Sequence, residues 1–68
     1  SMSELIVNGK SEQYRDGLTV LALLEQRALA GKRVAVERNG EIVPKGRHAE
    51  TILAAGDRLE IVVAVGGG

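Results

Sequence analysis

Two Asn-Gly pairs, each lying between short segments that favour β-strands, constrain the fold of this chain more than any other feature. The first pair occupies residues 8–9, after the β-branched run Leu5-Ile6-Val7 and before a polar segment at 10–15. The second occupies residues 39–40, between the alternating segment 34–38 and the run Glu41-Ile42-Val43. Asn-Gly tolerates the positive φ angles that a two-residue hairpin turn requires. The sequence therefore predicts two β-hairpins.

One segment between the hairpins has the pattern of an amphipathic helix. Residues 20–29 are strong helix formers, and the apolar side chains that share one face are Val20, Leu23, Leu24 and Ala28. Thr19 can accept a hydrogen bond from the first turn, and Gly31 can take the left-handed conformation that closes the last one. We expect a helix of about three turns.

The remaining segments define the fold class. Residues 58–65 form the most strand-like segment of the chain. Residues 45–55 have no clean period, so we expect a loop with one helical turn around 47–50 and with Ile52 or Leu53 plugging the core. A single helix can bury its apolar stripe against only one face of one sheet. The prediction is an α+β roll, in which one main helix packs on a mixed sheet of four to five strands.

Composition and charge argue against several classes of function. Nine Lys and Arg balance nine Asp and Glu among 68 residues, so nothing attracts the chain to nucleic acid or to an acidic membrane. No apolar run exceeds five residues, which is too short to span a membrane, and we expect a cytoplasmic protein. The chain has no cysteine and one histidine, His48, which we expect on a surface turn without a catalytic role. We expect no bound metal or cofactor.

The chain ends in three glycines, Gly66, Gly67 and Gly68. Glycine has no side chain to pack and loses the most entropy on ordering, so we expect a folded domain over residues 2–65 and a flexible tail over 66–68. Such a tail can carry its terminal carboxylate through a narrow tunnel into the active site of another protein. A partner must activate that carboxylate, because this chain has neither a nucleophilic constellation nor a phosphate-binding loop. A glycine end without function is the alternative interpretation.

The last strand contributes a candidate docking surface beside the tail. Its period of two places Leu59, Ile61 and Val63 towards the helix and Val62 and Ala64 on the opposite face. Ile6 of the first strand can join this opposite face, and Val65 connects it to the tail. The predicted partner-binding residues are therefore Ile6, Val62, Ala64, Val65, Gly66 and Gly67. Scattered exposed aliphatic residues are also normal on protein surfaces.

Several blocks of the chain together resemble one known family. The blocks are Leu5-Ile6-Val7-Asn8-Gly9, Thr19-Val20, Leu23-Leu24-Glu25, Val34-Ala35-Val36-Glu37, Asn39-Gly40-Glu41-Ile42-Val43-Pro44, Gly56-Asp57, Glu60-Ile61-Val62 and Ala64-Val65-Gly66-Gly67-Gly68. They resemble the ThiS family, the sulfur carriers of thiamine biosynthesis, which have the ubiquitin-like β-grasp fold. The blocks that end in Val-Pro and in Gly-Gly are the most specific. In place of His48, many relatives have an aromatic residue.

The resemblance implies a function as a carrier rather than as an enzyme. In this family an adenylating enzyme uses ATP to activate the terminal glycine, and a persulfide donor converts the acyl-adenylate to a thiocarboxylate. Thiazole synthase then takes the sulfur. Carried over by position, Gly68 would hold the sulfur, and Gly66 and Gly67 would form the threaded tail. ATP would be used by the partner and not bound by this chain.

Two other functions remain open from the sequence. The small subunit of molybdopterin synthase shares the fold and the glycine end but serves another pathway. A ubiquitin-like binding module that transfers nothing would need neither an activated terminus nor a sulfur donor.

Overall fold

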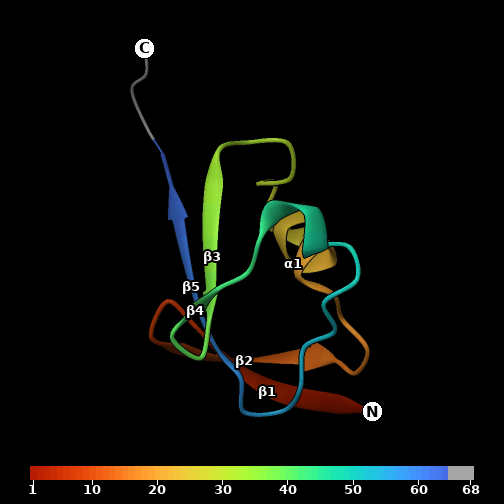
Figure 1. The fold of residues 1–68 in the computed structure, drawn as a ribbon. Coiled ribbons are helices and arrows are strands. Elements are labelled where there is room, and N and C mark those ends of the chain that lie inside the picture. The colour runs from red at the N-terminus through yellow and green to blue at the C-terminus, as the bar shows by residue number, and fades with distance from the viewer. Residues whose placement is uncertain (65–68) are drawn as a thin grey trace.

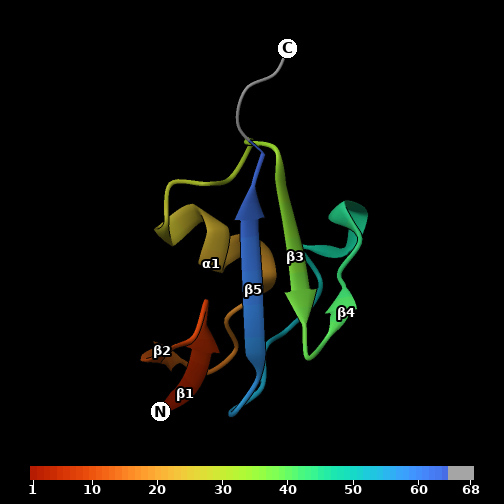
Figure 2. The ribbon, with the colours of Figure 1, turned by 90° about the vertical axis from the view of Figure 1, so that its left-hand side faces the viewer.

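A computed structural model describes residues 1–64 and shows a five-stranded sheet with one helix on one face (Figure 1). The elements are, in chain order, β1 (Met2–Val7), β2 (Lys10–Arg15), α1 (Val20–Gln26), β3 (Val34–Arg38), β4 (Glu41–Ile42), a 3₁₀ turn (Lys45–Arg47) and β5 (Arg58–Val63). Their order across the sheet is β2-β1-β5-β3-β4, and β5 runs parallel to β1 and antiparallel to β3. Figure 2 shows the face of the sheet that α1 does not cover. The predicted fold class is confirmed.

Both Asn-Gly pairs form the hairpin turns that the sequence predicts. Asn8 and Gly9 have φ angles of 50° and 80°, and Asn39 and Gly40 have φ angles of 52° and 87°. These values match the turn in which both central residues are left-handed, whose twist suits antiparallel strands. The first turn also joins the hairpin to the last strand, because Ile61 N donates to Asn8 Oδ1 at 2.7 Å.

The helix starts where the sequence predicts and ends earlier. Thr19 Oγ1 accepts a hydrogen bond from Ala22 N at 3.1 Å, which confirms the predicted cap. The predicted end, with Gly31 closing three turns, is wrong: α1 stops at Gln26, and Ala28 takes the left-handed conformation with φ 58°.

The hydrogen bonds at this end define a Schellman motif. Leu29 N donates to Leu24 O at 2.8 Å, and Ala28 N donates to Glu25 O at 3.0 Å. The reversal at Ala28 turns Leu29 back against the core. The same reversal leaves Ala28 exposed, although the sequence pattern places it on the buried stripe. Packing of the partly buried Leu29 side chain against the core therefore accounts for the early helix end.

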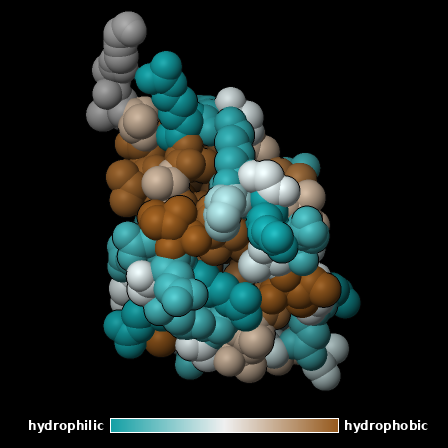
Figure 3. Space-filling view, in the orientation of Figure 1, coloured by the Kyte–Doolittle hydropathy of each residue, from teal (hydrophilic) through white to brown (hydrophobic). Residues whose placement is uncertain are grey.

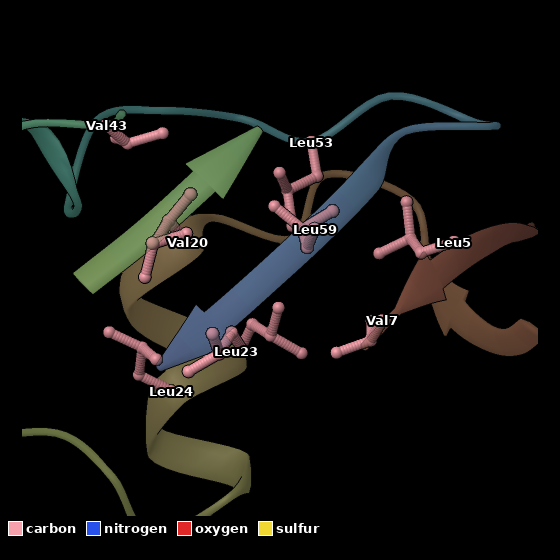
Figure 4. Packing of buried hydrophobic residues seen from close by; sticks show 10 residues of the cluster. Leu5, Val7, Val20, Leu23, Leu24, Val43, Leu53 and Leu59 are labelled. Carbon is pink, nitrogen blue, oxygen red and sulfur yellow. The ribbon is translucent and has the colours of Figure 1, made fainter. Parts of the chain in front are cut away.

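A single aliphatic core joins the sheet and the helix (Figure 4). The helix contributes Val20, Leu23 and Leu24, which are at most 2% exposed. Its other members are Leu5, Val7, Val36, Val43, Leu53, Leu59 and Ile61. Of the two candidates for the plug in the long loop, Leu53 is buried and Ile52 is 60% exposed.

The loop after β4 buries the histidine that the sequence analysis places on the surface. The 3₁₀ turn covers Lys45–Arg47, slightly before the predicted helical turn at 47–50. It folds back over the helix, where His48 O accepts from Leu21 N at 2.9 Å. The imidazole is 6% exposed, and its Nε2 donates to Val43 O at 3.1 Å. The surface prediction for His48 is therefore wrong, and the ring is part of the packed interior.

The left-handed Ala28 leads to a prediction about stability. We expect Ala28→Gly to raise the free energy of unfolding by about 0.5–1 kcal/mol, because a left-handed alanine is disfavoured by its Cβ atom. Ala22→Gly, inside the helix, is the matched control and should lower the free energy of unfolding by about 1 kcal/mol. Urea unfolding measures both. A loss of stability in both variants would contradict the Schellman assignment.

Candidate functional site

The strand β5 carries the chain towards its C-terminus from the middle of the sheet. Leu59 and Ile61 point towards α1 and are 0% and 7% exposed, as predicted. Val63, which is predicted to face the same way, is 38% exposed. Figure 1 shows that the end of β5 extends beyond the helix. The helix therefore does not cover Val63 fully.

The backbone pairing of β5 continues to the last described residue. Val63 lies opposite Val34 of β3, and Ala64 N donates to Arg33 O at 2.9 Å. The position of Ala64 is thus set by the neighbouring backbone of residues 33–34. The predicted tail residues Val65, Gly66, Gly67 and Gly68 lie outside the described residues, and the domain boundary at residue 65 remains a prediction.

The uncovered face of the sheet brings together part of the predicted docking surface. Val62 is 61% exposed and lies opposite the exposed Ala35 of β3, and the exposed Ala64 follows two residues later. Ile6 is not part of this group. It lies opposite Arg58, four residues before Val62, which corresponds to roughly 13 Å along a strand.

Two further features of this face are absent from the sequence predictions. Ile42 of β4 is 62% exposed and lies opposite Glu37. Glu37 also lies opposite Glu60 of β5, so two exposed carboxylates adjoin the apolar row of Val62 and Ala35. Alternation along each strand predicts that each of these side chains is exposed. Only the strand order of the sheet shows that they are neighbours.

A buried carboxylate fixes the point where β5 begins. Asp57 is 7% exposed, and its oxygens accept from Arg38 Nε at 2.8 Å, Asn39 Nδ2 at 2.9 Å and Ala54 N at 2.8 Å. Arg58 N donates to Asn39 Oδ1 at 2.9 Å, which completes a link between the β3–β4 turn and the start of β5. The sequence indicates a turn at Gly56-Asp57 but gives no sign that the carboxylate is buried.

The hydrogen bonds to Asp57 outweigh the cost of burying it. Burial disfavours the charged form and acts to raise the pKa of the carboxyl group. The donors at Ala54, Asn39 and Arg38 favour the charged form and hold the pKa below its usual value. Asp57 therefore remains an ionised, fully bonded anchor at neutral pH.

The described residues offer little for chemistry of their own. Among residues 1–64, no three side chains of His, Asp or Glu are grouped so that they could hold a metal ion. In the same part of the chain, no helix has the length and apolar character needed to cross a membrane.

A small mixed sheet that packs one helix against one face, with the C-terminal strand in its middle, defines the ubiquitin-like β-grasp class. Residues 4–68 match the ThiS family, and the chain belongs to that family. The match covers nearly the whole chain, so the predicted family is confirmed.

Individual relatives agree with this assignment. The chain is 45% identical over 65 residues to the sulfur carrier protein ThiS of Bacillus subtilis, covering 94% of this chain and 98% of that one. The crystal structure of the thiamine biosynthesis protein ThiS from Geobacter metallireducens superposes with a TM-score of 0.80 at 34% identity, covering 96% of this chain and 99% of that one. Both relatives support the assignment of the chain to the ThiS family.

Longer proteins also contain a similar segment. A thiazole synthase of Paramagnetospirillum magneticum is 45% identical over 65 residues, and one of Magnetococcus marinus is 36% identical over 62 residues. These matches cover 96% and 91% of this chain. The chain spans only about a fifth of the length of either protein, 20% and 19% respectively.

The lowered pKa of Asp57 predicts a pH dependence of stability. A carboxyl group whose pKa is lower in the folded state stabilises the fold above its unfolded value of about 4, and this contribution is lost as the pH falls through the folded value. We expect Asp57→Asn to cost about 2 kcal/mol at pH 7 and clearly less at pH 3. Urea unfolding at the two pH values measures the difference.

Asp16→Asn, at an exposed carboxylate, is the matched control for the loss of one charge. An equal loss of stability for Asp57→Asn at pH 7 and at pH 3 would contradict the assigned role of the ionised form.

Proposed function

We propose that this protein carries sulfur as a thiocarboxylate on its C-terminal Gly68. The observation that carries the proposal is the family match, which extends through the glycine end of the chain to residue 68. The chain contains no cysteine, so its own side chains cannot hold the sulfur as a persulfide. We therefore place the sulfur on the terminal carboxylate, as membership of the ThiS family implies.

The chemistry needs three reagents from outside the chain. In an adenylating enzyme, a Gly68 carboxylate oxygen attacks the α-phosphorus of ATP and pyrophosphate leaves. The terminal sulfur of a persulfide donor then attacks the acyl carbon and displaces AMP, and a thiol cleaves the resulting acyl disulfide to leave the thiocarboxylate. In this scheme the chain is a co-substrate of its partners and not an enzyme, and ATP is bound by the partner.

Thiazole synthase is the proposed acceptor of the sulfur. Two proteins named thiazole synthase contain a segment similar to this chain, which supports a functional connection between the two activities. The same relatives, together with the ThiS proteins, favour thiamine biosynthesis over molybdopterin formation and over a binding module that transfers nothing.

The partners must also recognise the folded part of the chain. We assign this role to the apolar row of Val62 and Ala64, with Ala35 opposite Val62, because it adjoins the point where the tail begins. We assign Val65 and the glycines Gly66 and Gly67 to partner binding as well, as the sequence predicts. Ile6 is a weaker candidate, since the register of β1 against β5 separates it from Val62.

Mass spectrometry of the protein produced together with an adenylating enzyme and a persulfide donor tests the proposal. We expect one oxygen of the C-terminus to be replaced by one sulfur. The Bacillus subtilis relative, treated in the same way, is the positive control. An unchanged mass under conditions that convert the control would refute the carrier function.

The glycine tail generates a prediction about activation. Gly67→Ala and Gly68→Ala each place a methyl group where the tail must enter the partner's active site. We expect adenylation to slow by about 100-fold, since small displacements of reacting groups have effects of that size. The thermal unfolding midpoint should be unchanged, because glycine contributes no side chain to the core. Variants that are adenylated as fast as the parent would contradict entry through a narrow tunnel.

A further inference from the structure

A cleft on the helix side of the sheet is the strongest feature that the proposed function leaves unexplained. It has a volume of about 140 Å³. Leu21, Leu24 and Val34 provide its apolar part, Lys32 and Lys45 stand at its margin, and the buried His48 contributes to its wall. A cavity of roughly 150 Å³ holds one benzene molecule, so this cleft suits a single apolar side chain and is too small for a nucleotide.

The two side chains of the cleft lining that are charged at neutral pH are both lysines, Lys32 and Lys45. Both lysines are exposed, and the residues that line the cleft include no carboxylate. Beyond the lining, exposed charges of both signs neighbour it in sequence, Arg33 and Arg47 as well as Glu25 and Glu50, so the positive charge is concentrated at the two lysines. The imidazole of His48 already donates to Val43 O, so it shapes the wall rather than binding a ligand through Nε2. An occupant that complements this cleft has an apolar centre and acidic flanks.

The position of the cleft connects it with the carrier function. Lys32 and Val34 line the cleft, and Arg33 between them accepts the hydrogen bond from Ala64 N that holds the end of β5. Figure 3 shows hydrophobic side chains gathered over the upper part of this view of the molecule, with hydrophilic side chains at their margin. An enzyme that holds the tail must therefore lie next to the cleft.

We propose that this cleft receives an aliphatic or aromatic side chain flanked by carboxylates from the adenylating enzyme that activates Gly68. The inference rests on the proposed carrier function. Before activation, the C-terminus of the chain is an ordinary carboxylate that does not distinguish it from other proteins. The adenylating enzyme must therefore recognise the folded part of the chain. The cleft lies on the helix side of the sheet, whereas Val62 faces the other side, so the enzyme contacts both sides of the tail's starting point.

Charge reversal at the margin of the cleft tests this site. The double variant Lys32→Glu, Lys45→Glu should raise the KM for the carrier in ATP–pyrophosphate exchange by about tenfold or more, because like charges across an interface are strongly unfavourable. The kcat should stay within about twofold, since the tail itself is intact. The same variant should also reduce the dependence of KM on salt.

Two further variants make the test specific. Lys10→Glu changes an exposed lysine of β2, away from the cleft, and is the matched control. Ala49→Leu fills the cleft from an exposed position without changing the charge, and it should raise KM as well. Thermal unfolding verifies that each variant is folded.

The outcomes separate this inference from the proposed function. An unchanged KM in both cleft variants, or an equal increase in Lys10→Glu, would overturn the docking site while the carrier function stands. An effect confined to sulfur transfer to thiazole synthase would show that the occupant is assigned to the wrong enzyme. Failure of the unmodified chain to be adenylated would overturn both proposals.

Discussion

The pairing of β5 between β1 and β3 is the interaction on which the rest of this structure depends. It inserts the last strand of the chain into the middle of the sheet, where Leu59 is completely buried against the helix. Asp57 fixes the start of this strand, and the bond between Ala64 and Arg33 fixes its end. Ala64, the last described residue, therefore lies at the end of a strand that is fixed at both ends.

The sequence predicted correctly those features that depend on residues close together in the chain. The Asn-Gly turns, the Thr19 cap and the inward side chains Leu59 and Ile61 follow from backbone preference and from alternation, and they were predicted correctly. The β-grasp fold and the carrier role came from the resemblance to a family and not from periodicity.

The features that the sequence did not reveal depend on contacts between distant segments. The early end of α1 follows from the packing of the partly buried Leu29 against the core, and the burial of His48 follows from a loop that folds over the helix. The separation of Ile6 from Val62 depends on the register of a parallel pair that joins the first and last strands. Likewise, two of the three donors that favour the ionised form of Asp57, Arg38 and Asn39, come from the β3–β4 hairpin, so the stretch around Asp57 does not contain the whole signal.

The parallel direction of β1 and β5 has a consequence for how the molecule can be attached to others. Because β1 and β5 run in the same direction, the beginning of β1 and the end of β5 lie at opposite ends of the molecule, as Figure 2 shows for the described residues. A second polypeptide joined in front of Met2 would stand at the pole remote from Ala64. Genetic fusion or immobilisation through that end of the molecule is therefore compatible with free access to Ala64, and the protein can be tethered there without obstructing the opposite end.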